Sequence, residues 1–365
     1  MDNLYNLMRC KVTNRSRRLI AWIVAGLMSV GIIGCSHSDS ASSRPSAPDS
    51  LTLGATITNE PTARLERTFA ASKSPIKALA FSPDGQMLVS GSLNGDTKIW
   101  NADTGELLRQ VSDRPSIQSI AVSADTVPAY QSILLASGDD QGGIELHNLT
   151  TGELRQTLAI PETVVQSVAF SPNGQWLASG QWNGTVQLWD IETGERLSTL
   201  ANHDYGVTVV MFAPATNTES PLLISADYDG NVKLWRSNNG ELLRTFNTAR
   251  YPVLALAISP DGKTLVTGNG DGTVKSWKLP SGRYIQGFLG HLDAVTALTI
   301  SPDGQTLASS SRDKTIKLWD LATGTLIQTL SDAQMDSIMA LAFSPNGDKL
   351  VSGDQAGMIQ VWHRN

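Results

Sequence analysis

The fold is decided by a pattern that is clearest in residues 282–323, which read GRYIQGFLGHLDAVTALTISPDGQTLASSSRDKTIKLWDLAT. Alternating apolar residues, as in Ile316-Lys317-Leu318-Trp319, are typical of half-buried strands. The Ser-Pro-Asp-Gly stretch that begins at Ser301 is a turn signal between two such strands. One copy of the pattern therefore predicts a small antiparallel sheet that cannot bury its apolar surface alone.

The same pattern recurs about every 42 residues from residue 63 to residue 365, a spacing typical of repeat architectures. Seven units result, at 63–104, 105–151, 152–193, 194–239, 240–281, 282–323 and 324–365. Hairpin turns are predicted at Ser82, Ser171, Ser259, Ser301 and Ser344. The third strand of each unit closes on a large ring side chain, in order Trp100, His147, Trp189, Trp235, Trp277, Trp319 and Trp362.

These repeats resemble the WD40 family over the whole of residues 63–365. Leu188-Trp189-Asp190 and Leu318-Trp319-Asp320 carry the dipeptide that names the family, and Gly290-His291 carries the pair that opens a family repeat. The resemblance implies an all-β, seven-bladed β-propeller with one four-stranded sheet per blade. Because the chain stops directly after a third strand, the first strand, Ala63–Phe69, is expected to complete the last blade.

The resemblance also implies a hydrogen-bonded set of four residues within a blade: a His before the first strand, a Ser or Thr on the second, an Asp in the tight turn, and the Trp. Two units carry all four. A grouping of His, Asp and Ser also invites a hydrolase reading, but the family uses it to hold loops, so we interpret it as structural. The predicted sets are His203, Ser225, Asp229 and Trp235 in unit 4, and His291, Ser309, Asp313 and Trp319 in unit 6.

The first 34 residues are typical of an export signal. They hold five basic residues and one acidic residue, and the stretch 19–34, LIAWIVAGLMSVGIIG, carries no charge. As a helix this stretch would be about 24 Å long, shorter than the roughly 30 Å hydrocarbon core of a bilayer. It therefore fits the apolar part of a cleavable signal peptide better than a permanent spanning helix.

This stretch ends Ile32-Ile33-Gly34-Cys35, which resembles the lipobox of bacterial lipoproteins. The resemblance implies cleavage before Cys35 and acylation of Cys35, which would anchor the chain to a bacterial cell-envelope membrane on its periplasmic or outer side. The alternative is an uncleaved anchor helix with an incidental cysteine. Ser16-Arg17-Arg18 leaves open whether export uses the twin-arginine route.

Residues 35–62 predict a flexible tether, because they are rich in Ser, Ala and Pro and lack a sustained apolar period. Leu51, Leu53 and Ile57 leave open that part of this segment packs on the domain instead. The expected organisation is a signal peptide at 1–34, the lipidated cysteine and tether at 35–62, and the propeller at 63–365.

Composition and motif searches exclude several classes of function. Both cysteines, Cys10 and Cys35, precede the repeats, so the repeats can form neither a disulfide nor a cysteine metal site. The net charge of −6, with the basic excess in the first 34 residues, argues against a nucleic-acid partner. No set of residues supplies a nucleophile, a base and oxyanion donors together. We therefore expect no enzyme activity, no cofactor and no metal site.

The loops at one end of the propeller form the predicted binding surface. In the family topology, the loops before the first strand and the turns after the second line the top face. Aromatic side chains there would bury a large area on binding and lose little side-chain conformational entropy, because they have few rotatable bonds. Binding hot spots favour such residues for this reason. The predicted partner-binding residues are Trp182, Tyr205, Tyr228 and Tyr251, with Arg250 and Arg312 as flanking charges. The alternative is that some rings pack back onto the blades.

The sequence therefore predicts a lipid-anchored, extracytoplasmic, monomeric propeller that docks another envelope protein on its top face. Longer hairpins at Ser123–Ser132 and Pro214–Pro221, together with the tether, would lie on the opposite face. Two rival functions remain: an enzyme or small-ligand carrier that uses the central channel, and an architectural lipoprotein of envelope assembly. The innermost strands argue against channel use, because stretches such as Ala78-Leu79-Ala80 and Ala297-Leu298-Thr299 are small and apolar.

Overall fold

The computed structural model describes residues 62–124, 127, 130–160, 162–200, 203–214, 221–248, 250–332 and 335–364. The predicted signal peptide, Cys35 and the tether up to residue 61 lie outside these ranges. Within the ranges, no helix is long and apolar enough to cross a membrane.

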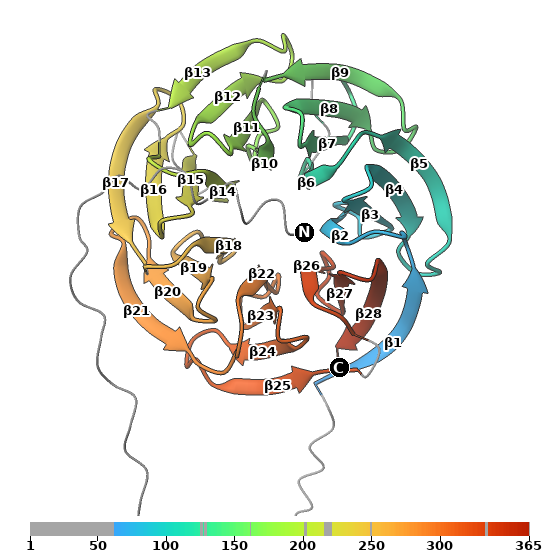
Figure 1. Ribbon diagram of the computed structural model, residues 1–365, viewed down its shortest axis with the longest axis vertical. Coiled ribbons are helices and arrows are strands. Elements are labelled where there is room, and N and C mark those ends of the chain that lie inside the picture. The colour runs from blue at the N-terminus through green and yellow to red at the C-terminus, as the bar shows by residue number, and fades with distance from the viewer. Residues whose placement is uncertain are drawn as a thin grey trace, which may run out of the picture. The chain divides into compact units, whose positions relative to one another are not determined.

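The described residues form seven four-stranded antiparallel sheets arranged as a ring (Figure 1). The predicted all-β, seven-bladed propeller is therefore confirmed. The innermost strands are β2 (Ile76–Phe81), β6 (Ile117–Val122), β10 (Val165–Phe170), β14 (Val207–Phe212), β18 (Val253–Ile258), β22 (Val295–Ile300) and β26 (Ile338–Phe343). The second strands are β3 (Met87–Ser92), β7 (Leu134–Asp139), β11 (Trp176–Gln181), β15 (Leu222–Asp227), β19 (Thr264–Asn269), β23 (Thr306–Ser311) and β27 (Lys349–Asp354).

The third strands are β4 (Asp96–Asn101), β8 (Gly143–Asn148), β12 (Val186–Asp190), β16 (Asn231–Arg236), β20 (Val274–Lys278), β24 (Ile316–Asp320) and β28 (Met358–Arg364). The outer strands of blades 1 to 7 are, in order, β5 (Leu107–Asp113), β9 (Leu154–Ala159), β13 (Arg196–Leu200), β17 (Glu241–Asn247), β21 (Arg283–Phe288), β25 (Leu326–Leu330) and β1 (Ala63–Ala70). Each sequence unit thus supplies three strands of one blade and the outer strand of the blade before it.

The hairpins between first and second strands form where the Ser-Pro stretches predict them. Ser301 Oγ accepts the backbone N–H of Thr306 at 2.9 Å, and the same bond of the same length recurs at Ser82, Ser171, Ser259 and Ser344. In blade 2, Ser123 Oγ accepts the N–H of Leu134 at 3.0 Å across the longer hairpin. Only part of the long hairpins of blades 2 and 4 lies in the described ranges.

The apolar core lies between the blades. Seven clusters of buried apolar residues each draw on two neighbouring blades. The cluster between blades 7 and 1 shows the pattern, with Val351 and Val361 packed against Ile76 and Trp100. Each blade therefore depends on both neighbours for burial of its two faces.

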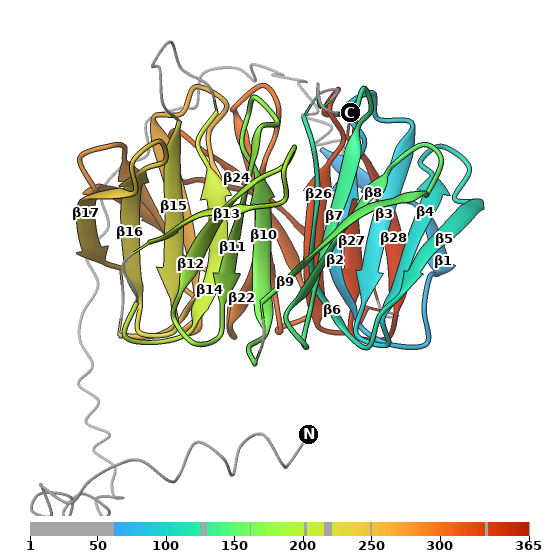
Figure 2. The ribbon, with the colours of Figure 1, turned by 90° about the horizontal axis from the view of Figure 1, so that it is seen from above.

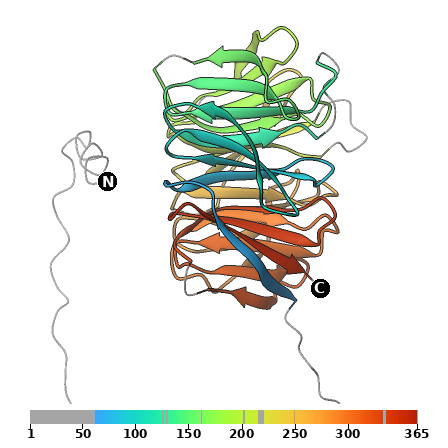
Figure 3. The same ribbon diagram turned by 90° about the vertical axis from the view of Figure 1, so that its right-hand side faces the viewer.

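The ring closes as the register of the repeats predicts. β1 pairs with β28 over its whole length, with Leu65 opposite Trp362. Figure 3 shows β1, in blue, beside the dark red strand at the C-terminal end of the chain. Gln328 on β25 of blade 6 holds the start of β1, because its amide accepts the N–H of Ala63 at 2.9 Å and donates to the Ala63 carbonyl at 2.8 Å. The predicted closure by Ala63–Phe69 is confirmed, and the observed strand is one residue longer.

We call the end of the ring that carries the loops before the innermost strands the top face. There, the first residue of the turn after each second strand donates its N–H to a carbonyl just before the innermost strand of the same blade, as Trp182 does to Val164 at 3.0 Å. In blade 3 this turn ends at Gly184, whose φ of +88° favours glycine, and a Cβ there would lie 2.3 Å from the His203 carbonyl oxygen. The C-terminal end of β28 lies at the opposite face, as Figure 2 shows.

Candidate functional site

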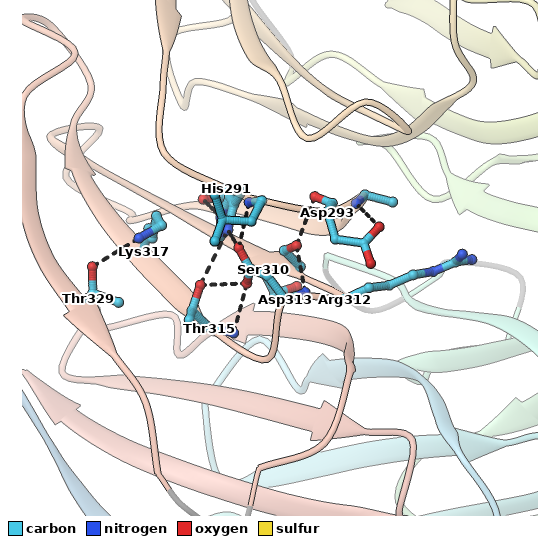
Figure 4. A network of polar contacts seen from close by, with 12 residues as sticks. His291, Asp293, Ser310, Arg312, Asp313, Thr315, Lys317 and Thr329 are labelled. Carbon is cyan, nitrogen blue, oxygen red and sulfur yellow. Dashed lines mark hydrogen bonds and ion pairs between the residues drawn. The ribbon is translucent and has the colours of Figure 1, made fainter. Parts of the chain in front are cut away.

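The four residues predicted for blade 6 are joined in one chain of hydrogen bonds. Trp319 Nε1–H donates to Ser309 Oγ at 2.8 Å. The His291 ring lies between Ser309 Oγ, 2.8 Å from Nε2, and Asp313 Oδ2, 2.9 Å from Nδ1. Figure 4 shows the His291 and Asp313 part of this network, with the Arg312 side chain pointing away from it.

Burial and hydrogen bonding fix the protonation of this network. Burial lowers the pKa of His291, although Asp313 opposes that shift, so the ring is neutral at pH 7. The carboxylate of Asp313 is ionised, because hydrogen bonds from Thr315, Leu292 and His291 lower its pKa by more than burial raises it. Nδ1–H of His291 therefore donates to Asp313, and Nε2 accepts the Ser309 hydroxyl.

In blade 4 the structure corrects one predicted residue. His203 Nδ1 lies 2.7 Å from Oδ2 of Asp227, at the end of β15, and not against Asp229. Asp229, two residues later in the turn, donates its backbone N–H to Asp227 Oδ1 at 2.9 Å. The other contacts are as in blade 6, since Ser225 Oγ lies 2.7 Å from His203 Nε2 and accepts Trp235 Nε1–H at 2.8 Å.

The serine hydroxyls in these networks are closed to substrates. Ser225 and Ser309 are completely buried, and each oxygen already accepts a tryptophan N–H. A hydrolase nucleophile needs an exposed oxygen with oxyanion donors around it. The arrangement can hold a loop against a blade, but a substrate cannot reach either serine hydroxyl.

The predicted aromatic surface, Trp182, Tyr205, Tyr228 and Tyr251, lies on the top face of blades 3, 4 and 5. Trp182 and Tyr228 pack edge to face with ring centroids 5.0 Å apart. Tyr205 and Tyr251 are more than half exposed, at 54% and 52%, and Trp182 is 41% exposed. The loop of Tyr251 reaches the turn of Tyr228 through the bond from Thr248 N–H to the Gly230 carbonyl.

Not every predicted residue is equally exposed. Tyr228 is half-buried, and burial raises the pKa of its hydroxyl while Arg312 opposes that shift. Arg250 is exposed at the rim. Arg312 is exposed too, and its side chain contributes to a cavity at the channel mouth together with Tyr228. The alternative of rings that pack back onto the blade therefore describes Tyr228 in part and does not describe Tyr205 or Tyr251.

The comparison with known families agrees with this geometry. The family described as WD domain, G-beta repeat matches six segments, at residues 63–101, 152–190, 194–236, 240–278, 282–320 and 324–363, which together exceed half of the chain. The chain belongs to the WD40 family. The unmatched unit is the second, in which His147 stands where the other units have Trp.

Three similar proteins illustrate how much of the chain individual relatives match. COMPASS component SWD3 of Saccharomyces cerevisiae is 29% identical over 121 residues, which cover 31% of this chain and 37% of that protein. The Lissencephaly-1 homolog of Caenorhabditis briggsae is 31% identical over 30% of this chain and 27% of its own length. WD repeat domain-containing protein 83 of Mus musculus is 30% identical over 27% of this chain and 30% of its own length. The matches thus span less than two fifths of each relative.

Blade 2 departs from the WD40 pattern at the Trp position. In the other six blades the Trp donates to a hydroxyl of the second strand at 2.8–3.1 Å, on Ser90, Ser179, Ser225, Thr267, Ser309 and Ser352. In blade 2 the corresponding Ser137 Oγ and Nδ1 of His147 are both buried without a hydrogen-bond partner. Burial lowers the pKa of His147, although Glu145 opposes that shift. The lowered pKa keeps the ring neutral.

Blade 2 also replaces the WD40 histidine contact. Arg114 precedes β6 and pairs with the buried Asp139 at 2.6 Å. Asp139 ends its second strand as Asp227 does in blade 4. The guanidinium therefore holds the loop where a histidine does so in blades 4 and 6.

Two features of the top face and channel mouth are not among the residues predicted from the sequence. Leu289 and Leu292 flank His291 and are 80% and 92% exposed, next to the blade that carries Tyr251. Their exposure could have been predicted from the sequence, because the two leucines flank the Gly290-His291 pair, which lies in a loop. The second feature is Lys77, which lines the channel. Its place in the channel could not be predicted from the sequence, because the apolar residues that follow it indicated an uncharged channel wall.

We predict that the stability contribution of the second-strand serine follows its number of partners. Ser225→Ala leaves His203 Nε2 and Trp235 Nε1 buried without a partner, and should lower the free energy of unfolding by about 2–4 kcal/mol. Ser137→Ala is the matched control at the same register position, and should cost less than about 1 kcal/mol because Ser137 Oγ has no partner. Equilibrium denaturation measures both. Equal losses would contradict the structural role assigned to the network.

Proposed function

We propose that this WD40 propeller is a docking scaffold that binds a partner protein through the aromatic surface on its top face. The observation that supports this proposal best is the exposure of Tyr205 and Tyr251 around the packed pair of Trp182 and Tyr228. A rigid pair at the centre with exposed rings beside it resembles the hot-spot arrangement of protein interfaces. One relative, by its name, is a component of COMPASS, which is in keeping with a part played in an assembly.

Charge and apolar area extend the proposed docking surface. Arg250 and Arg312 lie at its edges, where an arginine can stack on a ring or pair with a carboxylate of the partner. Leu292 adds an exposed apolar side chain on blade 6. Exposed apolar side chains gathered near aromatic rings mark interaction sites more often than scattered single ones.

The second part of the proposal concerns location. The lipobox at Ile32-Ile33-Gly34-Cys35 supports a lipid anchor at Cys35, and with it a partner among bacterial cell-envelope proteins. β1 ends at Ala70, beside the top-face loop that enters β2, so it begins at the opposite face. A tether that leads into β1 would leave the aromatic surface turned away from the membrane.

Site-specific photocrosslinking tests the docking surface. A photoreactive phenylalanine analogue at Tyr205 should crosslink one discrete protein in cells that produce the chain. Tyr284 is the matched control, because it is 51% exposed but lies on the outer strand β21. Adding Tyr251→Ala should reduce the Tyr205 crosslink about ten-fold, as expected for a hot-spot ring. The same crosslink from Tyr284, or a yield unaffected by Tyr251→Ala, would contradict the proposal.

Cysteine substitution tests the anchor separately. With wild-type sequence, the chain should fractionate with membranes and incorporate labelled fatty acid. Cys35→Ser should abolish the label, whereas Cys10→Ser should not, because Cys10 lies in the segment expected to be removed. Undiminished labelling of Cys35→Ser would overturn the proposed lipidation.

A further inference from the structure

A ring of side chains lines the mouth of the central channel. The second residue of every innermost strand contributes to a cavity of about 220 Å³, to which Tyr228 and Arg312 add side chains from the top-face turns. Such a volume has room for one small anionic group with several waters, since a water occupies about 30 Å³ in the liquid. Five of the seven ring residues are polar: Lys77, Gln118, Gln166, Thr208 and Thr296.

The strands turn these residues toward the channel by a shared irregularity. In β2 the register with β3 shifts between Ile76 and Ala78, so that Lys77 has no partner across the sheet. The same shift occurs at the second residue of each of the other six innermost strands. A β-bulge re-aims the side chain of the extra residue. The bulge explains how a lysine can line a channel whose neighbouring strand residues are small and apolar.

The charges at the channel mouth are uncompensated. Lys77 and Arg312 are both positive, and no carboxylate is among the described residues that line the cavity. Neither side chain forms a hydrogen bond or ion pair within the described part of the chain, and Figure 4 shows Arg312 extended away from the blade 6 network. Burial and the nearby Arg312 lower the pKa of Lys77. A partly desolvated cation next to another cation is costly unless an anion is bound.

Neutral donors surround the two cations. The Gln166 side chain has no partner within the described residues, so its amide N–H groups are free to donate. Tyr228 borders the same cavity. Deeper in the channel the wall becomes apolar, with Leu256, Leu298 and Leu341. An anion would therefore be held at the mouth and would not pass further.

We propose that the channel mouth binds one oxyanion, a carboxylate or a phosphate group, between Lys77 and Arg312. Arginine matches such a group with two parallel N–H donors, and lysine adds a point charge. The site does not depend on the proposed docking. The anion is either free in solution or carried by a docked partner, because Tyr228 belongs to both the cavity and the aromatic surface.

Equilibrium dialysis of the full chain with radiolabelled inorganic phosphate and with labelled acetate, at pH 7 and constant ionic strength, tests the site. We expect saturable binding of one anion per chain. Lys77→Gln and Arg312→Gln should each weaken it about ten-fold or more, the loss of one charge-assisted contact. Lys73→Gln and Arg196→Gln are matched controls, because both cations are exposed and do not line the cavity.

Two results would overturn the proposal: no saturable binding of either anion, or equal weakening by the control substitutions. Misfolding is excluded as a cause by thermal unfolding, because Lys77→Gln removes an unpaired cation and should not lower the midpoint. Repeating the Tyr205 crosslink in Lys77→Gln identifies the source of the anion. A lost crosslink assigns it to the docked partner, and a retained one to a free anion. Failure of docking itself would show as no Tyr205 crosslink in the unsubstituted chain.

Discussion

Burial of apolar surface between blades is the constraint on which the rest of the structure depends. Every described core cluster draws on two blades, so no blade has a complete core of its own. An open row of seven blades would leave two sheet faces in water and two strand edges unpaired. The pairing of β1 with β28 removes this cost, and Gln328 of blade 6 fixes where β1 begins. Top-face loops and the channel mouth keep their geometry because the ring is closed.

Hydrogen-bond networks within the blades add to the apolar contacts between them. The bond from Trp to a second-strand hydroxyl occurs in six blades, and the histidine and aspartate extend it in blades 4 and 6. Blade 2 keeps the backbone of the pattern while it replaces the histidine with Arg114 and the Trp with His147. The fold tolerates this substitution because the interblade apolar clusters, which include residues of blade 2, are still complete.

Much of this architecture could be predicted from the sequence, because the period of about 42 residues and the fixed Trp position report directly on strand order. Ring closure was predictable for the same reason. The aspartate of blade 4 was not, because the sequence offers two acids there, Asp227 at the end of β15 and Asp229 two residues later in the turn. Alignment with Asp313 of blade 6 selected the turn residue, but in blade 4 the strand end itself carries the acid.

The polar residues at the channel mouth were not predicted, for a different physical reason. Alternation along a regular strand assigns every second residue to one side, and the bulge at the second residue of each innermost strand breaks that alternation. Bulges depend on how strands meet in the ring, and no local residue pattern announces them. Exposure of single rings such as Tyr205 likewise depends on how a loop lies across the neighbouring turn. The sequence could therefore suggest an exposed ring there, but only the structure shows how far it is exposed.

Hydrogen exchange measured blade by blade tests the closed ring most directly. The comparison is between the full chain and a variant that lacks Ala63–Ala70, the whole of β1. If interblade burial makes the ring one cooperative unit, amide protection should fall in all seven blades of the variant, including blades 3 to 5 on the far side. Loss of protection confined to blade 7 and its two neighbours, with blades 3 to 5 unchanged, would contradict the account.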